Sequence, residues 1–173
     1  MGSPIYRTFH QNGVTVPEIR TARAEDVPVL APRLRAADKR ELKAATGKGP
    51  KTALRDSFEV SSKVHSIVEG NDVLGMFGVT PHPEDFLTGL CWGVSAPELM
   101  TGKHKLWFIR NSPRILEIQH RHFPELWGLI DARNTRHLRW LEWTGFQLGA
   151  TYCVGPERRP FVEFRRTQGQ ANV

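Results

Sequence analysis

The chain has 173 residues, of which 39% are hydrophobic and 24% are charged, and its formal net charge is +6. That length suits one domain with one contiguous core, and the share of apolar residues excludes a chain that is disordered throughout. No apolar run approaches the roughly 18 residues that a bilayer crossing needs, and the N-terminal residues lack the apolar stretch of a secretory signal, so we expect no membrane partner.

The first third of the chain predicts an arm, a strand and two helices. Residues 1–13 are polar and are expected to form a flexible arm. Residues 14–22 have the β-favouring side chains of a strand. A helix is predicted over 25–42, because its apolar residues recur at helical spacing, and Pro32 is expected to kink it. A glycine-rich stop separates it from a second helix over about 51–62.

The middle of the chain predicts a hairpin followed by a buried strand. Residues 64–69 and 73–80 have strand patterns and flank a turn at 70–72, whose residues tolerate positive φ. After a short loop, residues 87–95 form an apolar run, which predicts a central strand of the sheet.

The last third alternates between helices and strands. Residues 103–123 keep one apolar helical face, but Ser112 is followed by a proline in the manner of a helix start, so two short helices or one kinked helix would fit. Residues 126–132 predict a strand, and 134–144 predict a helix that begins with a capping asparagine and closes at Gly145. Two more strands are expected over 146–154 and 161–165.

The stretch that begins at Asp131 resembles the last strand-to-helix unit of the GNAT family of acyl-CoA N-acetyltransferases. In that family a strand ends at an asparagine, a short helix follows, and a Gly-Phe pair turns the chain into the next strand. Asn134, Gly145 and Phe146 stand at those places. An asparagine can cap the helix, and a glycine can take its left-handed exit.

The order of elements is similar to that family as well. The resemblance therefore implies a single GNAT-like α/β (α+β) domain over 14–166, with a mixed, mostly antiparallel, twisted sheet flanked by about four helices. Residues 167–173 are then a C-terminal tail.

A closer resemblance is to the internal virion protein family of short-tailed phages, which is itself built like a GNAT domain. The residues that carry it are Leu90-Cys91-Trp92-Gly93-Val94, Pro124-Glu125-Leu126-Trp127, Asp131-Ala132-Arg133-Asn134 and Trp140-Leu141. This resemblance implies a phage origin, a location in the host cytoplasm or the phage virion, and a host or virion protein as partner.

The site for acetyl-CoA or CoA departs from the GNAT pattern. A working enzyme of the family holds the pyrophosphate on backbone N–H groups of a glycine-rich turn at a helix N-terminus. The corresponding stretch, 95–105, has one glycine, a proline without an N–H, and Glu98, which repels phosphate. The segment from Thr101 to Lys103 is either a small anion nest or an ordinary polar loop. The resemblance places these residues beside a bound cofactor: Val94, Ser95, Thr101, Gly102, Lys103, Lys105 and Asn134.

The catalytic groups of the family are also hard to find. Its general acid is a tyrosine in the helix after the asparagine, and by spacing that position here is Leu141. Leucine transfers no proton, so this route is closed unless Tyr152 or another group substitutes. The central hairpin and the strand after it line the acceptor side in this fold. Candidate general bases there are His65, Glu69, His82 and Glu84, each of which is read more simply as an ordinary side chain.

Basic residues gather in the C-terminal half. Arg136 and Arg139 share a helix face and Arg133 precedes that helix, so the three form a candidate docking surface. Such a surface suits the phosphates of a cofactor or of nucleic acid, or an acidic protein. The alternative is that these arginines fringe a core face.

Cysteines and tryptophans give two further expectations. Cys91 and Cys153 are isolated in apolar segments, so we expect two buried, reduced thiols and no metal site. Trp140 and Trp143 share a short helix that cannot bury both, so one of them is expected to be partly exposed.

The sequence leaves three functions open. The first is a phage-encoded GNAT-fold protein that acts by binding, with a degenerate acyl-CoA site. The second is an active N-acetyltransferase with an atypical cofactor loop. The third, a nucleic-acid-associated protein, is favoured by charge alone.

Overall fold

The computed structural model describes residues 15–169, so the predicted arm over 1–13 and residues 170–173 of the predicted tail lie outside the described range. One sheet of seven strands runs in the order β1-β2-β3-β4-β5-β7-β6. Its strands are β1 (Glu18–Thr21), β2 (Lys63–Glu69), β3 (Asp72–Pro81), β4 (Thr88–Ser95), β5 (Glu125–Asp131), β6 (Gln147–Val154) and β7 (Arg159–Thr167). All neighbours are antiparallel except β4 and β5, which are parallel. The predicted single α/β domain with a mixed, mostly antiparallel sheet is confirmed.

Five α-helices fall within residues 15–169, one more than the approximate expectation. They are α1 (Asp26–Leu30), α2 (Ala36–Thr46), α3 (Pro50–Val60), α4 (Gly102–His120) and α5 (Thr135–Trp143). The extra helix arises because the predicted helix over 25–42 is divided. Pro32 lies in a 3₁₀ turn, η1 (Ala31–Arg33), and the backbone is extended at Leu34 and Arg35 before α2 begins. A proline cannot donate the N–H that continues an α-helix, so Pro32 separates two helices instead of kinking one.

The region around Ser112 is not a helix start. α4 runs without interruption from Gly102 to His120, with Pro113 inside it. The Ser112 hydroxyl donates to the carbonyl of Phe108 one turn earlier, at 2.8 Å, instead of capping a new helix. Of the two alternatives for 103–123, the pair of short helices is therefore wrong.

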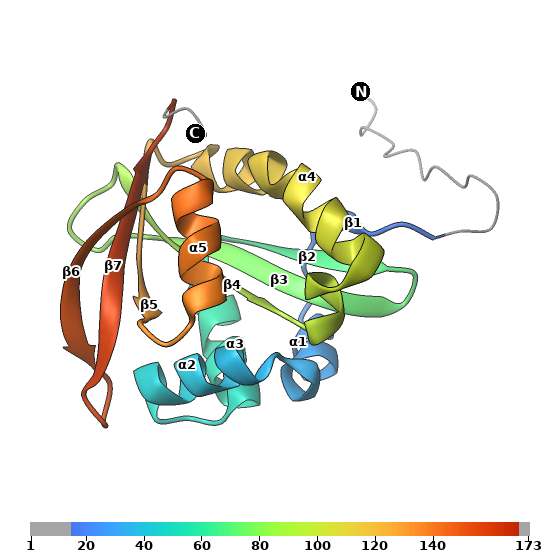
Figure 1. The fold of residues 1–173 in the computed structure, drawn as a ribbon, viewed down its shortest axis with the longest axis horizontal. Helices are drawn as coiled ribbons and strands as arrows, with labels where there is room; N and C mark the ends of the chain where they lie inside the picture. The colour runs from blue at the N-terminus through green and yellow to red at the C-terminus, as the bar shows by residue number, and fades with distance from the viewer. Residues whose placement is uncertain (1–14, 170–173) are drawn as a thin grey trace.

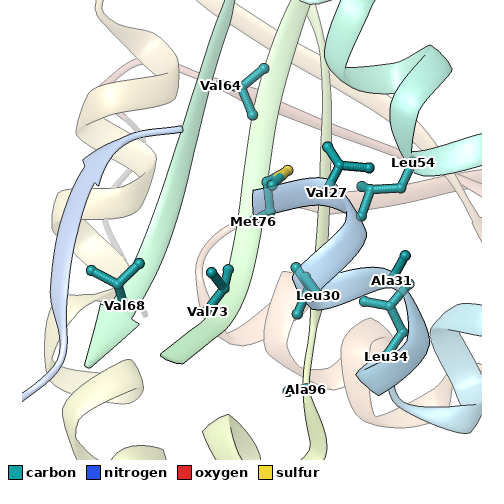
Figure 2. Close-up of a cluster of buried hydrophobic side chains, with 10 residues drawn as sticks. All are labelled: Val27, Leu30, Ala31, Leu34, Leu54, Val64, Val68, Val73, Met76 and Ala96. Carbon is teal, nitrogen blue, oxygen red and sulfur yellow. The ribbon is translucent and has the colours of Figure 1, made fainter. Parts of the chain in front are cut away.

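Helices cover both faces of the sheet (Figure 1). On the first, which we call the α1 face, Val27 and Leu30 of α1 and Leu54 of α3 pack with Val73 and Met76 of β3, as Figure 2 shows. Neighbouring residues of a strand point to opposite faces. The next residue, Phe77, accordingly packs with α4 on the second face, which we call the α5 face. α5 also packs on this face, where its Leu141 joins Leu126, Ile130 and Phe164.

The parallel strands β4 and β5 stay together only at their beginnings. Their register pairs are Thr88 with Glu125, Gly89 with Leu126, and Leu90 with Trp127. Beyond the last pair the strands run apart, and in the view of Figure 1 α5 lies between them. The gap between β4 and β5 interrupts the sheet in the middle of the domain.

Candidate functional site

The end of β4 turns part of its backbone towards this gap. Successive residues of a strand direct their N–H and C=O groups to opposite neighbours. The N–H of Ala96 donates to the carbonyl of Leu74 in β3, at 2.8 Å, so alternate residues counted back from Ala96 bond to β3. Gly93 and Ser95 therefore direct their backbone groups away from β3 and towards the gap.

Helix α2 closes the far end of that backbone edge. The Ser95 N–H donates to Oδ2 of Asp38, and the Ser95 carbonyl accepts the N–H of Arg35, each at 2.9 Å. Asp38 is fully enclosed and is also bound by the Arg35 guanidinium. Gly93 thus lies on this edge between the part of β4 that pairs with β5 and Ser95, which contacts α2.

A cavity of about 700 Å³ lies along the end of β4, between this strand and the helices α4 and α5, and none of its lining residues belongs to β5. Its lining includes Cys91 and Gly93 on the α5 face of β4 and also Trp92 and Val94 on the α1 face, so the cavity reaches into the gap itself. The predicted cofactor positions Val94 and Ser95 line it. Helices α4 and α5 add apolar side chains to the wall, among them Phe108, Ile109, Trp140, Leu141 and Trp143.

Three cationic side chains without a counter-charge stand on the lining of this cavity. Lys105 of α4 and Arg136 and Arg139 of α5 are all exposed. None of them belongs to an ion pair with any residue between 15 and 169, whereas Arg35, also on the lining, is bound to Asp38. We call Lys105, Arg136 and Arg139 the cationic rim. Unpaired positive charges beside an apolar cavity favour a ligand with an anionic group and an apolar or amide-bearing arm.

The loop expected to hold a pyrophosphate uses two of its backbone N–H groups for hydrogen bonds within the loop. In η2 (Pro97–Met100) the Leu99 N–H donates to Ala96, and the Thr101 N–H donates to Glu98. The Lys103 ammonium lies 3.0 Å from Glu69. Thr101, Gly102 and Lys103 do not line the cavity. Of the two interpretations of this segment, these contacts favour the ordinary polar loop.

Helix α5 and its N-cap residue hold two buried polar atoms without partners, on the predicted cofactor residue Asn134, which does not line the cavity, and on His137, which does. Asn134 stands at the N-cap position, but its ψ of 57° lies outside the usual capping range and its side chain makes no capping hydrogen bond, which corrects that expectation. Its Nδ2 donates to Oε2 of Glu41 at 2.9 Å, while its Oδ1 has no partner within the described residues. One turn later, His137 lines the cavity and its Nδ1 is likewise unpartnered. Burial lowers the pKa of His137 to about 4, so the ring is neutral at pH 7.

Leu141 is the residue that its spacing matches to the family's tyrosine, and that match stays a prediction. Its side chain is 2% exposed and forms part of the cavity wall, so the wall is apolar at this point.

Glu41 is a residue of this region that the sequence interpretation missed. The residue is half-buried, but its carboxyl group is enclosed, and this burial raises the pKa to about 7. The hydrogen bond from Asn134 opposes the rise, and the charges of Asp38 and Asp131 add to it. Asp38 and Asp131 each have an arginine partner, whereas Glu41 has no cation in the ion pairs of residues 15–169. The spacing of Asp38 and Glu41, three residues apart on one helix face, was the available signal.

Replacing Glu41 by Gln is expected to stabilise the protein above pH 7 and to flatten its pH dependence. A folded-state pKa above the unfolded value means that the protonated carboxyl stabilises the fold; this contribution is complete below about pH 4 and is lost as the pH rises to about 7. Glutamine keeps the oxygen that accepts from Asn134 but does not ionise. Urea unfolding should show equal stabilities at pH 4 and a gain of about 3 kcal/mol at pH 8. Parallel pH profiles for the two proteins would contradict this, and Glu142→Gln, at an exposed site on α5, is the control.

The candidate bases Glu69 and His65 are held by other contacts. Burial disfavours the ionised form of Glu69, but hydrogen bonds from Lys103 and His104 outweigh it and lower the pKa of Glu69. His65 stacks on Phe77 at 5.4 Å between ring centroids, and burial lowers its pKa. Neither side chain lines the cavity.

The remaining catalytic candidates also lie outside the cavity lining. His82 accepts the N–H of Glu84 at its Nδ1, at 3.2 Å, and both belong to the segment between β3 and β4. Tyr152, the proposed substitute acid, is exposed on β6. A catalytic role for Glu69, His82, Glu84 or Tyr152 stays a prediction that these contacts do not support.

Two other sequence predictions are decided by burial. Trp143 is 46% exposed while Trp140 is half-buried and donates to Ser112, so the expectation that the helix cannot bury both is confirmed. The expected burial of both thiols is wrong for Cys153, which is exposed because β6 is an edge strand. Cys91 is the enclosed thiol, and burial raises its pKa to about 12.

The three arginines of the candidate docking surface do not act as one group. Arg133 binds the carboxylate of Asp131 at 2.6 Å, so the positive charge of Arg133 is already paired. Arg136 and Arg139 remain together on the cavity, as their spacing on one helix face predicts. No helix within residues 15–169 is long and apolar enough to span a membrane.

Solved structures share this architecture although the sequences differ widely. An N-acetyltransferase from Staphylococcus aureus Mu50 has a TM-score of 0.62 and 17% identity, covering 88% of this chain and 98% of its own. An acetyltransferase of the GNAT family from Streptococcus pneumoniae has a TM-score of 0.60 and 10% identity, covering 89% and 100%. The ribosomal-protein-S5-alanine acetyltransferase from Vibrio fischeri has a TM-score of 0.59 and 11% identity, covering 91% and 99%.

Comparison by sequence adds no assignment, because no family model and no curated protein matches the chain. At such low identities the structural likeness concerns the fold. The TM-scores near 0.6 over almost the whole length of these neighbours show that the chain has the fold of the GNAT acetyltransferases.

Proposed function

We propose that the protein binds an acyl-CoA thioester in the cavity between β4, α4 and α5 and transfers the acyl group to an amine. The observation that carries this proposal is the cationic rim beside an apolar cavity at the splayed strands. The GNAT fold of the neighbours adds support, since their names describe acetyltransferases.

The residues present fit CoA in an unusual manner. The pantetheine arm carries two amides, and the unpartnered Nδ1 of His137 on the cavity lining would bond to one of them. Gly93 offers a backbone edge on the other side. The phosphates would be held by the side chains of the cationic rim, because the η2 loop uses its own N–H groups internally.

The proposed transfer has no tyrosine at Leu141 to protonate the departing sulfur. A thiol has a pKa of about 8.5, so a thiolate can leave without a proton near neutral pH. General acid catalysis typically contributes about 10²–10⁴ in rate, and we therefore expect a slow transferase. When bound, the cofactor supplies the activated acyl group, and the protein positions it and excludes water from the cavity.

Binding without transfer is the second candidate, and the apolar Leu141 is the observation that favours it. It agrees with a GNAT-fold protein that acts by binding. A phage origin, a host or virion partner for Arg136 and Arg139, and an association with nucleic acid stay predictions of the sequence.

Acetyl-CoA is expected to stabilise the protein strongly. A ligand at a hundred times its Kd adds about 2.7 kcal/mol, which should raise the melting temperature of a chain this size by about 5–10 °C. Calorimetry gives the Kd, and release of free thiol in the presence of Nα-acetyl-lysine methylamide reports transfer. Binding with thiol release supports the first candidate, and binding without release supports the second. The absence of binding would contradict both.

A further inference from the structure

A second group of polar and aromatic side chains lies on the opposite face of the sheet from α5. Leu126 and Phe164 pack on the α5 face, so their neighbours Trp127 and Glu163 point to the α1 face. The Trp127 Nε1 donates to Oε1 of Glu163 at 2.6 Å. The ring of His82 meets the indole edge-on, with 6.2 Å between centroids. We call Trp127, Glu163 and His82 the indole–carboxylate cluster.

This cluster stands where the gap between β4 and β5 begins. Trp127 is the β5 member of the last register pair with β4, opposite Leu90. The cavity lining includes Cys91, the next residue of β4, on the other face. An acyl group that enters the gap from the cavity would therefore be approached from the α1 face beside Trp127.

No Cβ stands beside Oε2 of Glu163, because the adjacent residue of β6 is Gly149. A Cβ added to Gly149 of β6 would lie 2.8 Å from Oε2 of Glu163, which is closer than such atoms approach. Arg165 lies 3.8 Å from the Oε1 atom that already holds Trp127, and it also binds Glu125 at 3.2 Å. Oε2 thus keeps its lone pairs for another donor.

The charge around the cluster is opposite in sign to that of the protein as a whole. Within a chain of net charge +6, three carboxylates lie on or next to the cluster, with Arg165 as the cation paired to two of them. The three are Asp85, Glu125 and Glu163. A carboxylate beside an indole favours an alkyl ammonium group, through an ion pair and a cation–π contact.

We propose that the indole–carboxylate cluster is the site for the amine acceptor, with Glu163 binding the ammonium group of a lysine-like side chain against Trp127. The ammonium loses one proton to solvent to give the amine that attacks the thioester, and the proton that the nitrogen loses on transfer neutralises the departing thiolate. This inference rests on the proposed function, because the cluster becomes an acceptor site only if a thioester occupies the gap. It locates the acceptor on the α1 face and names the negatively charged Glu163 as its anchor, whereas the cavity on the α5 face contains no such group.

The test is a titration of Nα-acetyl-lysine methylamide followed by the indole N–H resonances in a ¹⁵N spectrum. Trp127→Phe assigns the Trp127 resonance, which the bond to Glu163 makes sensitive to the carboxylate. We expect the lysine compound to shift this resonance and its neutral hydroxyl analogue to leave it unchanged. Glu163→Gln keeps an acceptor for the indole but removes the charge, and should weaken lysine binding at least tenfold. The matched control Glu157→Gln, which removes one carboxylate from the exposed β6–β7 turn, should bind nearly as wild type.

Two further measurements keep the outcome decisive. The Glu163→Gln variant should bind acetyl-CoA with unchanged affinity. Absence of acetyl-CoA binding by the wild type would contradict the proposed function and not the amine site. Gly149→Ala should also weaken lysine binding, because it displaces the Glu163 carboxylate without changing charge. Equal lysine binding by wild type and Glu163→Gln, equal binding of the neutral analogue, or a wild-type Trp127 resonance that does not respond would each overturn the proposal.

Discussion

Reversing the charges of Arg136 and Arg139 together should weaken the binding of acetyl-CoA about 100-fold. Both arginines line the cavity and neither has a carboxylate partner among residues 15–169, so their charges are available to a ligand. Hydrogen bonds to charged groups are worth about 1.5–3 kcal/mol each. Loss of both bonds is expected to cost about 3 kcal/mol of binding free energy. This value is in the lower part of the summed range, because exposed side chains also lose flexibility when they bind a ligand. Calorimetry on the double Glu variant measures this directly.

The matched control places the same change of charge elsewhere. Arg110 and Arg114 are exposed on α4 and do not line the cavity. Their double replacement by Glu alters net charge equally, and at physiological salt the screening length of about 8 Å limits its effect on the cavity. The melting temperature should stay near wild type in both variants. Equal affinity of the two double variants for acetyl-CoA would contradict the cationic rim.

The same pair of arginines also separates the proposals for a partner. An anionic protein or nucleic acid that docks on Arg136 and Arg139 would compete with CoA for the mouth of the cavity. The cavity behind these side chains, with its half-buried Trp140 and enclosed Leu141, is unnecessary for docking on an exposed surface. The hollow and the charges together favour a small ligand with an anionic end over a purely surface-bound partner.

Local features of the fold could be predicted because they depend on neighbouring residues. Gly70 takes a φ of 60° in the β2–β3 turn, and Gly145 takes 86° after α5, as their surroundings indicated. The division at Pro32 was recognised as a disturbance, but its extent depended on the extended backbone that follows it. Hairpins and helix ends are set within a few residues, and sequence patterns report them well.

The candidate site is harder to predict because its contacts join distant parts of the chain. Asn134 was recognised, but its partner Glu41 is 93 positions earlier, and it is this bond that turns the amide away from capping. Trp127 and Glu163 are 36 positions apart and meet only because β5 and β7 pair. Lys103 and Lys105 looked equivalent in sequence, yet Glu69 binds the first and the cavity receives the second. Residues that look alike in sequence differ in their partners because of tertiary packing, which sequence spacing alone does not predict.

Replacing Gly155 by Ala is expected to destabilise the fold by about 3 kcal/mol. Gly155 has a φ of +73°, and a Cβ there would lie 1.8 Å from the carbonyl oxygen of Ala44, close to the end of α2. The backbone of the β6–β7 turn must therefore move away from α2. Left-handed strain accounts for about 1–2 kcal/mol, and the forced displacement of two packed segments adds a similar cost. Thermal unfolding should show a melting temperature lower by about 10 °C.

Gly70→Ala separates the two causes of that loss. Gly70 has a φ of +60°, but a Cβ there would have nothing within 4 Å, so it should lose about 1 kcal/mol through strain alone. Equal losses in both variants would mean that contact between the β6–β7 turn and α2 adds no stability. The contact matters for the site because α2 carries Asp38, which binds Ser95 at the end of β4, and Glu41, which binds Asn134 at the start of α5. If α2 positions both edges of the gap, the Gly155 variant should bind acetyl-CoA more weakly than Gly70→Ala even below its melting temperature.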